Sequence, residues 1–144
     1  MMMTLDEVID HLTYVQQQYG DLPVAHEWFE EGPDEGCIVR LLPVMLHDVD
    51  RADDRSLNRL HIEQLHRGAP APISELLTGL NKAAQAHGGA LRVVLETDYG
   101  YIDDLDDIEV VHSTDQLGPF FEEDIVSIPP SLFPCALLRP TATF

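Results

Sequence analysis

The sequence has few basic residues for its acidic content. Eight Lys and Arg stand against twenty-six Asp and Glu, so the formal net charge is −18. No Lys or Arg precedes Arg40, and none lies between Val93 and Leu138. Contacts with nucleic-acid phosphates or with an anionic membrane require cations that such a chain does not supply. The composition therefore argues against direct binding of nucleic acid or of a membrane, and it favours a basic protein partner.

Long apolar runs and frequent cysteines are also lacking. No window approaches the roughly eighteen apolar residues of a transmembrane helix. The opening MMMTLDEVID has neither the basic region nor the apolar core of a signal peptide. Cys37 and Cys135 lie far apart and in no metal or redox spacing. The two could pair, but we predict two buried free thiols, as is typical of a cytosolic protein. These absences favour a cytoplasmic location.

The remaining composition is that of one globular domain. The chain has 144 residues, of which 44% are hydrophobic, enough for a core of its own. Residues 4–19 predict a helix, because Thr4 and Glu7 form a capping-box pattern and apolar residues follow at helical spacing. Gly20 is a typical helix stop. Residues 22–29 and 37–46 have strand composition, and residues 30–36 between them have the composition of a turn.

A similar pattern recurs 68 residues later. Residues 73–87 predict a second helix, with Gly88 in the position of Gly20, and strands are expected to follow. We therefore predict an α+β fold, in which two pseudo-repeated helix plus antiparallel β-hairpin halves form one compact domain. The predicted boundaries are a first half at 1–67, a linker at 68–72, a second half at 73–128 and an extended C-terminal tail at 129–144 that packs over the core. A third strand is expected within 58–65, where a helix is the alternative, and another within 123–128.

The stretch DYGYIDDLDDIE, residues 98–109, is the strongest feature outside the expected core. With its counterpart around Glu30 and Glu31, it is expected at the turn between the first two strands of its half. Three interpretations remain. The turns are simply solvated, they dock on the basic site of another protein, or they bind a cation without a dedicated site. An EF-hand is excluded, because Gly100 and Ile102 occupy ligand positions and Asp103 stands where Gly is required.

Aromatic side chains accompany these acids: Trp28 and Phe29 precede the first cluster, and Phe120 and Phe121 adjoin a third acidic run. Buried aromatic area together with charge suits a protein interface, although any one of these residues more often covers its own sheet. The residues predicted to contact a partner are Glu30, Glu31, Asp34, Glu35, Tyr99, Tyr101, Asp103, Asp104, Asp106 and Asp107.

Catalytic motifs find little support, so no enzyme activity, cofactor or metal is predicted. Both cysteines lie in apolar strings, and no serine has the context of a nucleophile elbow. The alternative function is a metal-binding domain or a metal-dependent enzyme in which side chains near the first hairpin meet as ligands. Its four residues are His47, Asp48, Asp50 and His61.

Two stretches carry a resemblance. TLDEVIDHLTYVQQQYGDLPV is similar to the opening of many small phage and prophage proteins, and GYIDDLDDIEVV resembles a Tyr-Asp-Asp hairpin in the same group. The resemblance covers roughly the first 45 residues and residues 73–112, and it implies a phage or mobile-element origin. The sequence therefore predicts a non-enzymatic acidic protein in the host cytoplasm that binds and inhibits a basic or nucleic-acid-binding host protein. A defence component of the CRISPR or restriction type fits, and the pattern also allows a homo-oligomer.

Overall fold

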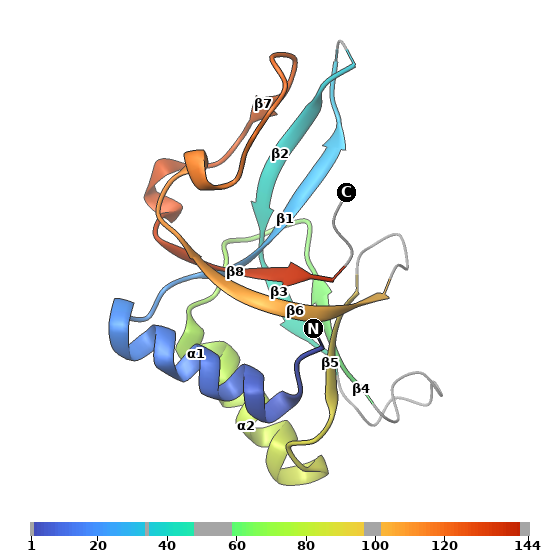
Figure 1. Cartoon of the computed structure of the whole chain (residues 1–144), viewed down its shortest axis with the longest axis vertical. Coiled ribbons are helices and arrows are strands. Elements are labelled where there is room, and N and C mark those ends of the chain that lie inside the picture. The colour runs from blue at the N-terminus through green and yellow to red at the C-terminus, as the bar shows by residue number, and fades with distance from the viewer. Residues whose placement is uncertain (1, 34, 48–58, 97–101, 142–144) are drawn as a thin grey trace.

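The computed structural model describes residues 2–33, 35–47, 59–96 and 102–141 (Figure 1). Its two α-helices are α1 (Leu5–Tyr19) and α2 (Ile73–His87). Its strands are β1 (Val24–Glu31), β2 (Cys37–Leu42), β3 (Val44–Leu46), β4 (Arg59–Gln64), β5 (Arg92–Glu96), β6 (Ile102–Val111), β7 (Ile125–Val126) and β8 (Cys135–Pro140). The predicted α+β class and the single compact domain are confirmed.

Helix α1 begins and ends where its sequence indicates. The Thr4 hydroxyl accepts from the Glu7 backbone N–H at 3.4 Å, and the Glu7 carboxylate accepts from the Thr4 N–H at 3.2 Å. This reciprocal pair satisfies two of the N–H groups that a helix start leaves unpaired. Gly20 ends the helix with a φ of 95°, a conformation that L side chains adopt at a cost.

Helix α2 confirms the second predicted helix, but another segment caps it. Pro72 at its N-cap has no side-chain hydrogen bond to offer. Asp21, just beyond the end of α1, takes this role by accepting from the Ser74 N–H at 2.7 Å and from the Ser74 hydroxyl at 2.6 Å. These hydrogen bonds lower the pKa of the Asp21 carboxyl, because they favour its charged form. The end of α1 and the start of α2 are thereby joined.

The opposite ends of the two helices also meet. The Asp6 N–H donates to the Gly89 carbonyl at 3.0 Å, so the start of α1 lies against the end of α2. A Cβ on Gly89 would come within 1.9 Å of the Asp6 carboxylate, which explains the glycine. The helices therefore lie side by side and antiparallel on one face of the sheet (Figure 1).

The strands form one mixed sheet in the order β3-β4-β5-β6-β8-β1-β2-β7. The hairpins β1–β2 and β5–β6 are antiparallel as predicted, whereas β4–β5, β1–β8 and β2–β7 pair in parallel. The antiparallel hairpins are therefore parts of a mixed sheet. Strand β8 from the C-terminal segment lies between β6 and β1 and joins the two halves. The predicted pseudo-repeat between them is not confirmed.

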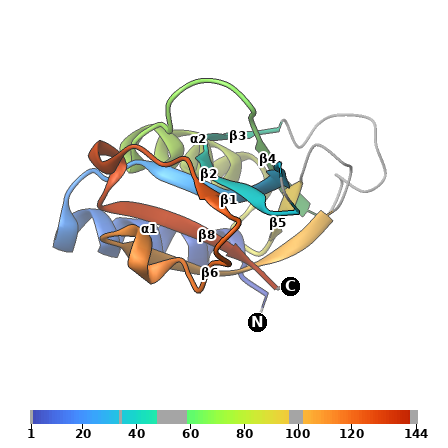
Figure 2. The ribbon, with the colours of Figure 1, turned by 90° about the horizontal axis from the view of Figure 1, so that it is seen from above.

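Pro43 divides the second predicted strand. Residues 37–46 were expected to be continuous, but proline has no backbone N–H for a ladder hydrogen bond, and the chain changes partners there. β2 pairs with β1 and β3 pairs with β4, so segments one residue apart lie near opposite ends of the sheet order. The sheet must therefore curl strongly (Figure 2).

Two buried side chains join the curled ends. His26 of β1 and Gln64 of β4 belong to strands that are not neighbours in the sheet, yet Gln64 Nε2 and His26 Nδ1 lie 2.7 Å apart. Burial, together with the nearby Arg139 charge, lowers the pKa of His26 to about 4. His26 is therefore neutral at pH 7 and serves the fold as a hydrogen-bonding group.

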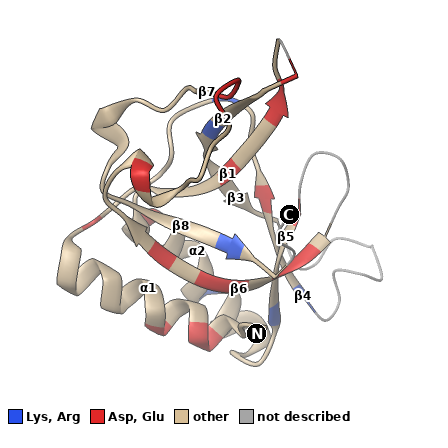
Figure 3. Ribbon diagram, turned by 45° about the horizontal axis from the view of Figure 1, so that its top comes forward, with Lys and Arg blue, Asp and Glu red and all other residues tan. Residues whose placement is uncertain are grey.

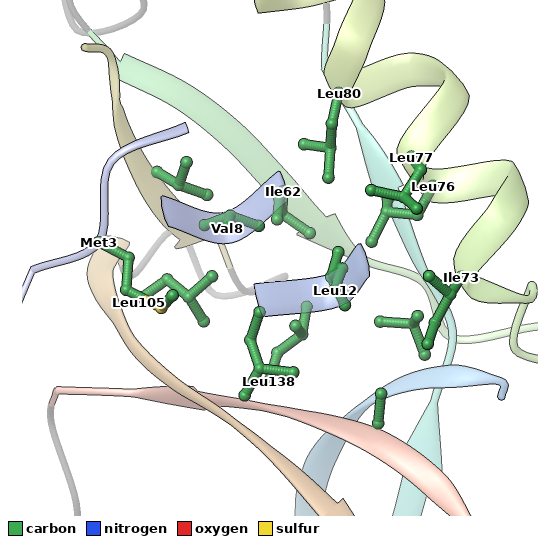
Figure 4. Packing of buried hydrophobic residues seen from close by; sticks show 14 of the residues in the cluster. Met3, Val8, Leu12, Ile62, Ile73, Leu76, Leu77, Leu80, Leu105 and Leu138 are labelled. Atoms are coloured by element: carbon green, nitrogen blue, oxygen red, sulfur yellow. The ribbon is translucent and has the colours of Figure 1, made fainter. Parts of the chain in front are cut away.

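Apolar side chains gather on both faces of the sheet. The larger cluster lies between the helices and the sheet and joins residues such as Leu12, Leu80 and Leu138 (Figure 4). The smaller cluster contains Leu137 of β8 and is covered by apolar residues of the segment between β6 and β8. Because side chains alternate along a strand, Leu137 and Leu138 serve opposite faces. The predicted C-terminal tail thus supplies a strand that both clusters enclose.

Other expectations have mixed outcomes. The segment 58–65 contains strand β4, and 123–128 contains the short strand β7, as predicted. Cys135 is a buried free thiol whose pKa burial raises to about 11, whereas Cys37 is free but only half-buried. Neither described helix is long and apolar enough to span a membrane.

Candidate functional site

Strand β6 carries residues 102–109 of the acidic stretch, for which the sequence predicts a turn. β6 pairs with β5 at its start and with β8 over the rest of its length, so it is an inner strand. The predicted turn position is wrong for the carboxylates from Asp103 to Glu109, because Leu105 and Ile108 between them are buried and hold the segment in the sheet. We name the five carboxylate residues of this strand the β6 acidic row: Asp103, Asp104, Asp106, Asp107 and Glu109. Tyr99 and Tyr101 lie outside the described residues.

The β6 acidic row is held by hydrogen bonds and ion pairs. Asp104 accepts from Arg92 of β5 at 2.6 Å. Asp107 accepts from the adjacent Ile108 N–H at 2.8 Å, beside an irregularity in the β6–β8 register between Leu105 and Asp107. Such a bulge turns successive side chains away from strict alternation. Carboxylates therefore leave β6 in more than one direction, each on a fixed backbone.

Arg139 of β8 joins the row to β1. Its guanidinium contacts Glu109 at 3.0 Å and Glu27 at 3.1 Å. Burial raises the pKa of the Glu27 carboxyl, the Arg139 charge opposes that rise, and the Glu109 charge adds to it. Among the described residues, Glu27 Oε2 is buried without a hydrogen-bond partner. Two carboxylates thus share one cation, and the group keeps a net negative charge.

The first acidic cluster lies elsewhere, at the free end of the β1–β2 hairpin. Glu30 and Glu31 close β1, and Glu35 follows in the turn with a φ of 66°. Asp34 lies outside the described residues. β1 pairs with β8 only as far as His26, so at about 3.3 Å per residue Glu31 stands about 16 Å beyond that contact. The two predicted clusters are therefore separate surfaces (Figure 3).

The hairpin end has one cation and additional acids. Arg40 of β2 contacts Glu30 at 2.9 Å. Glu122 and Glu123 are exposed, and Glu123 lies against the hairpin at Gly36, where an added Cβ would come within 2.1 Å of the Glu123 carbonyl oxygen. The partner-contact prediction omitted these two residues. Their proximity to an aromatic pair in the sequence was the available signal.

The four aromatic residues near acids divide into buried and exposed. Trp28 is buried, with its ring and that of His66 in a T-shaped contact, and Phe120 packs on the smaller core cluster. Phe29 and Phe121 are exposed. The interpretation that such residues cover their own sheet therefore holds for the first pair, and only the second pair is accessible to a partner.

The residues of the metal alternative are partly described. His47 and His61 face each other across β3 and β4, with a backbone hydrogen bond of 2.9 Å. Their side chains are engaged by carboxylates: His47 lies 2.7 Å from Glu63, and His61 lies 3.0 Å from Glu96. Asp48 and Asp50 lie outside the described residues. Within the described part of the chain, no three His, Cys, Asp or Glu residues form a group suited to a metal ion.

In comparisons with known proteins, no family model, curated protein or solved structure gives a significant match to this chain.

Proposed function

We propose that this protein is a non-enzymatic acidic inhibitor that binds a basic, nucleic-acid-handling protein of a host cell. In this proposal the β6 acidic row occupies the site where that partner would hold phosphates. A phage or mobile-element protein directed against a CRISPR or restriction component fits this description. The single observation that carries the proposal is the placement of the row on an inner strand.

Strand geometry fixes the spacing of the row along β6. Its five carboxylates span seven residues and leave the strand in more than one direction. At about 3.3 Å per residue, they average one carboxylate per about 5 Å along the strand axis, against one phosphate per about 3.4 Å along one DNA strand. A rigid array of this kind meets Lys and Arg side chains without first losing conformational freedom.

Internal ion pairs do not cancel the charge of the surface. Arg92 and Arg139 contact the row, but Arg139 is shared with Glu27. Asp107 accepts a backbone hydrogen bond, and its side chain is exposed. With a net charge of −18 around it, the row offers a field that accelerates encounter with a basic protein.

The test is capture of host proteins on the immobilised protein at about 50 mM and about 500 mM sodium chloride, followed by competition with duplex DNA. We expect a nucleic-acid-binding protein to be captured at low salt and released by both high salt and DNA. The variant Asp103→Asn/Asp106→Asn/Asp107→Asn should capture about tenfold less while keeping its far-UV circular dichroism spectrum.

A matched control separates the row from net charge. Asp10→Asn/Glu75→Gln/Asp115→Asn removes the same charge from exposed positions elsewhere. It should retain capture within about twofold. Equal loss in both variants would show that only total charge matters, and undiminished capture by the β6 variant would remove the row from the interface.

A further inference from the structure

The sheet end farthest from the helices exposes large apolar side chains. The fractional exposures are 51% for Phe29, 80% for Phe121, 47% for Ile125 and 37% for Val126. We name these four residues the docking end. Half of the eight exposed large hydrophobic residues of the described chain lie here (Figure 1). Apolar residues gathered at one end in this way are typical of an interaction site.

The strand register explains how these side chains meet. Phe29 of β1 pairs with Val39 of β2, and Val39 pairs with Val126 of β7. The three side chains therefore point to the same face, with buried Val39 between two exposed neighbours. Ile125 pairs with Ile38 and points to the other face. Apolar surface thus lies on both sides of β7.

The turn that presents Phe121 is held firmly. One Asp124 oxygen accepts from the Cys37 N–H at 2.9 Å, and the other accepts from the Phe121 N–H at 2.8 Å. The close approach of Glu123 to Gly36 fixes the turn against the hairpin. Phe120 is anchored on the core, so its neighbour Phe121 projects outward. An exposed aromatic side chain on a fixed backbone loses little backbone entropy on binding.

Strand β7 also leaves backbone groups available. Within the described residues it pairs with β2 alone. The Ser127 N–H faces β2, because it donates to the Val39 carbonyl at 2.8 Å. Successive residues of a strand direct their backbone groups to opposite edges, so the N–H and carbonyl of the preceding residue, Val126, point away from β2. An open strand edge of this kind accepts an extended segment of another chain by adding a strand to the sheet.

Charge identifies the segment that fits. Glu31, Glu35, Glu122 and Glu123 surround the docking end, while Arg40, the cation described at this end, is paired with Glu30 (Figure 3). A second copy of the chain would bring the same acids together, and like charges repel. We propose that the docking end binds an extended partner segment in which Lys or Arg alternates with apolar residues, with Phe121 as the apolar anchor. This inference deepens the proposed function, on which its choice of a basic partner rests.

The test uses two fluorescent ten-residue peptides, one alternating Lys with Val and one alternating Glu with Val, and measures their anisotropy with the full chain. We expect the Lys peptide to bind and the Glu peptide not to bind. Phe121→Ser should weaken binding about tenfold, as expected when an interface anchor is truncated. Glu122→Gln/Glu123→Gln should weaken it about threefold and reduce its dependence on salt. Tyr14→Ser, an exposed aromatic change on α1, should leave binding unchanged.

The backbone contribution has its own variant. Val126→Pro removes the outward N–H and leaves the groups that face β2 in place. It should therefore weaken binding of the Lys peptide relative to the wild type. Phe121→Ser changes an exposed side chain, so it keeps the test valid if the proline variant does not fold.

Several results would overturn the docking end. The Lys peptide could bind Phe121→Ser as tightly as it binds the wild type, or it could fail to bind the wild type. The chain could also form a dimer in sedimentation that Phe121→Ser abolishes. The proposed function fails separately. Host-protein capture that survives in Phe121→Ser but is lost in the β6 variant would keep the acidic row and discard the docking end, and the reverse pattern would discard the row.

Discussion

Replacing Arg139 by Met tests whether the cation between β1 and β6 is needed to keep Glu27 charged inside the fold. Arg139 contacts both Glu27 and Glu109, and the Glu27 side chain is only 13% exposed. Without the guanidinium, a poorly solvated carboxylate would lie beside another negative charge. Stability should fall, because a charge left unpaired at a largely buried position cannot regain its hydration.

The size of the loss follows from exposure. Breaking a fully buried ion pair costs about 3–5 kcal/mol, and an exposed pair contributes about 0.2–1 kcal/mol. Arg139 is 27% exposed, and the Glu27–Arg139 distance is 3.1 Å. We therefore place Arg139→Met between these limits, at about 2 kcal/mol. For a chain of this length, that lowers Tm by about 4–8 °C.

The loss should depend on pH in a defined direction. Burial already raises the pKa of Glu27, and a raised carboxyl pKa means that stability is lost as pH rises through the folded-state value. Removing Arg139 raises that pKa further, so the loss extends to higher pH. The stability gap between variant and wild type should therefore be smaller at pH 4, where Glu27 is protonated to a greater extent, than at pH 8.

Urea unfolding at pH 4 and pH 8 measures this gap. Glu27→Gln in the Arg139→Met background should restore most of the stability at pH 8, since a neutral amide replaces the unpaired charge. Arg92→Met is the matched control, because it breaks the more exposed pair with Asp104 and should cost less than about 1 kcal/mol. A gap that is independent of pH, or a double variant as unstable as Arg139→Met alone, would refute the reasoning.

Three further predictions concern the fold and its charge. Asp21→Ala should cost about 1 kcal/mol at pH 7, because it uncaps α2. The lowered pKa of Asp21 means that its contribution to stability is lost as pH falls through the folded-state value, so the variant should differ less from the wild type in acid. Urea unfolding at pH 3 and pH 7 would show both effects. Gly36→Ala should cost about 1–3 kcal/mol, because its Cβ would meet the Glu123 carbonyl at 2.1 Å, and thermal unfolding would reveal it. Raising sodium chloride from about 0.05 M to about 0.5 M should raise Tm by screening the net charge of −18, and a fall in Tm would contradict this.

Local structure was predictable where the signal lies in neighbouring residues. Thr4 and Glu7 define the start of α1, and Gly20 and Gly88 end the two helices, because capping and positive φ depend on the identity of single residues. The Asp21 cap of α2 was not predictable in the same way. It joins residues 53 positions apart, so no local pattern in the sequence records it.

The order of the strands could not be predicted from hydrophobic periodicity for the same reason. The apolar run at residues 135–138 shows that this segment is buried, but it does not show that β8 inserts between β6 and β1. Pro43 signals a break in a strand, yet the transfer of the chain between ends of the sheet depends on pairing with β4. The acidic row was assigned to a turn because its carboxylates outweighed the buried residues between them. Leu105 and Ile108 are enough to keep that segment in the sheet.

The few arginines bear on whether the acidic surface is merely tolerated. Three arginines each contact a carboxylate of low exposure: Arg139 contacts Glu27, Arg92 contacts Asp104 at 25% exposure, and Arg40 contacts Glu30 at 30%. Pairing matters most where water is scarce, because there the energy of an isolated charge is highest. The arginines thus stabilise the less exposed carboxylates of the fold. Exposed carboxylates, such as those of Asp107, Glu122 and Glu123, contribute to the negative electrostatic field around the protein. A surface that only tolerated acids would gain stability from additional exposed cations at little cost. The proposed partner, which requires the negative field, would account for their scarcity.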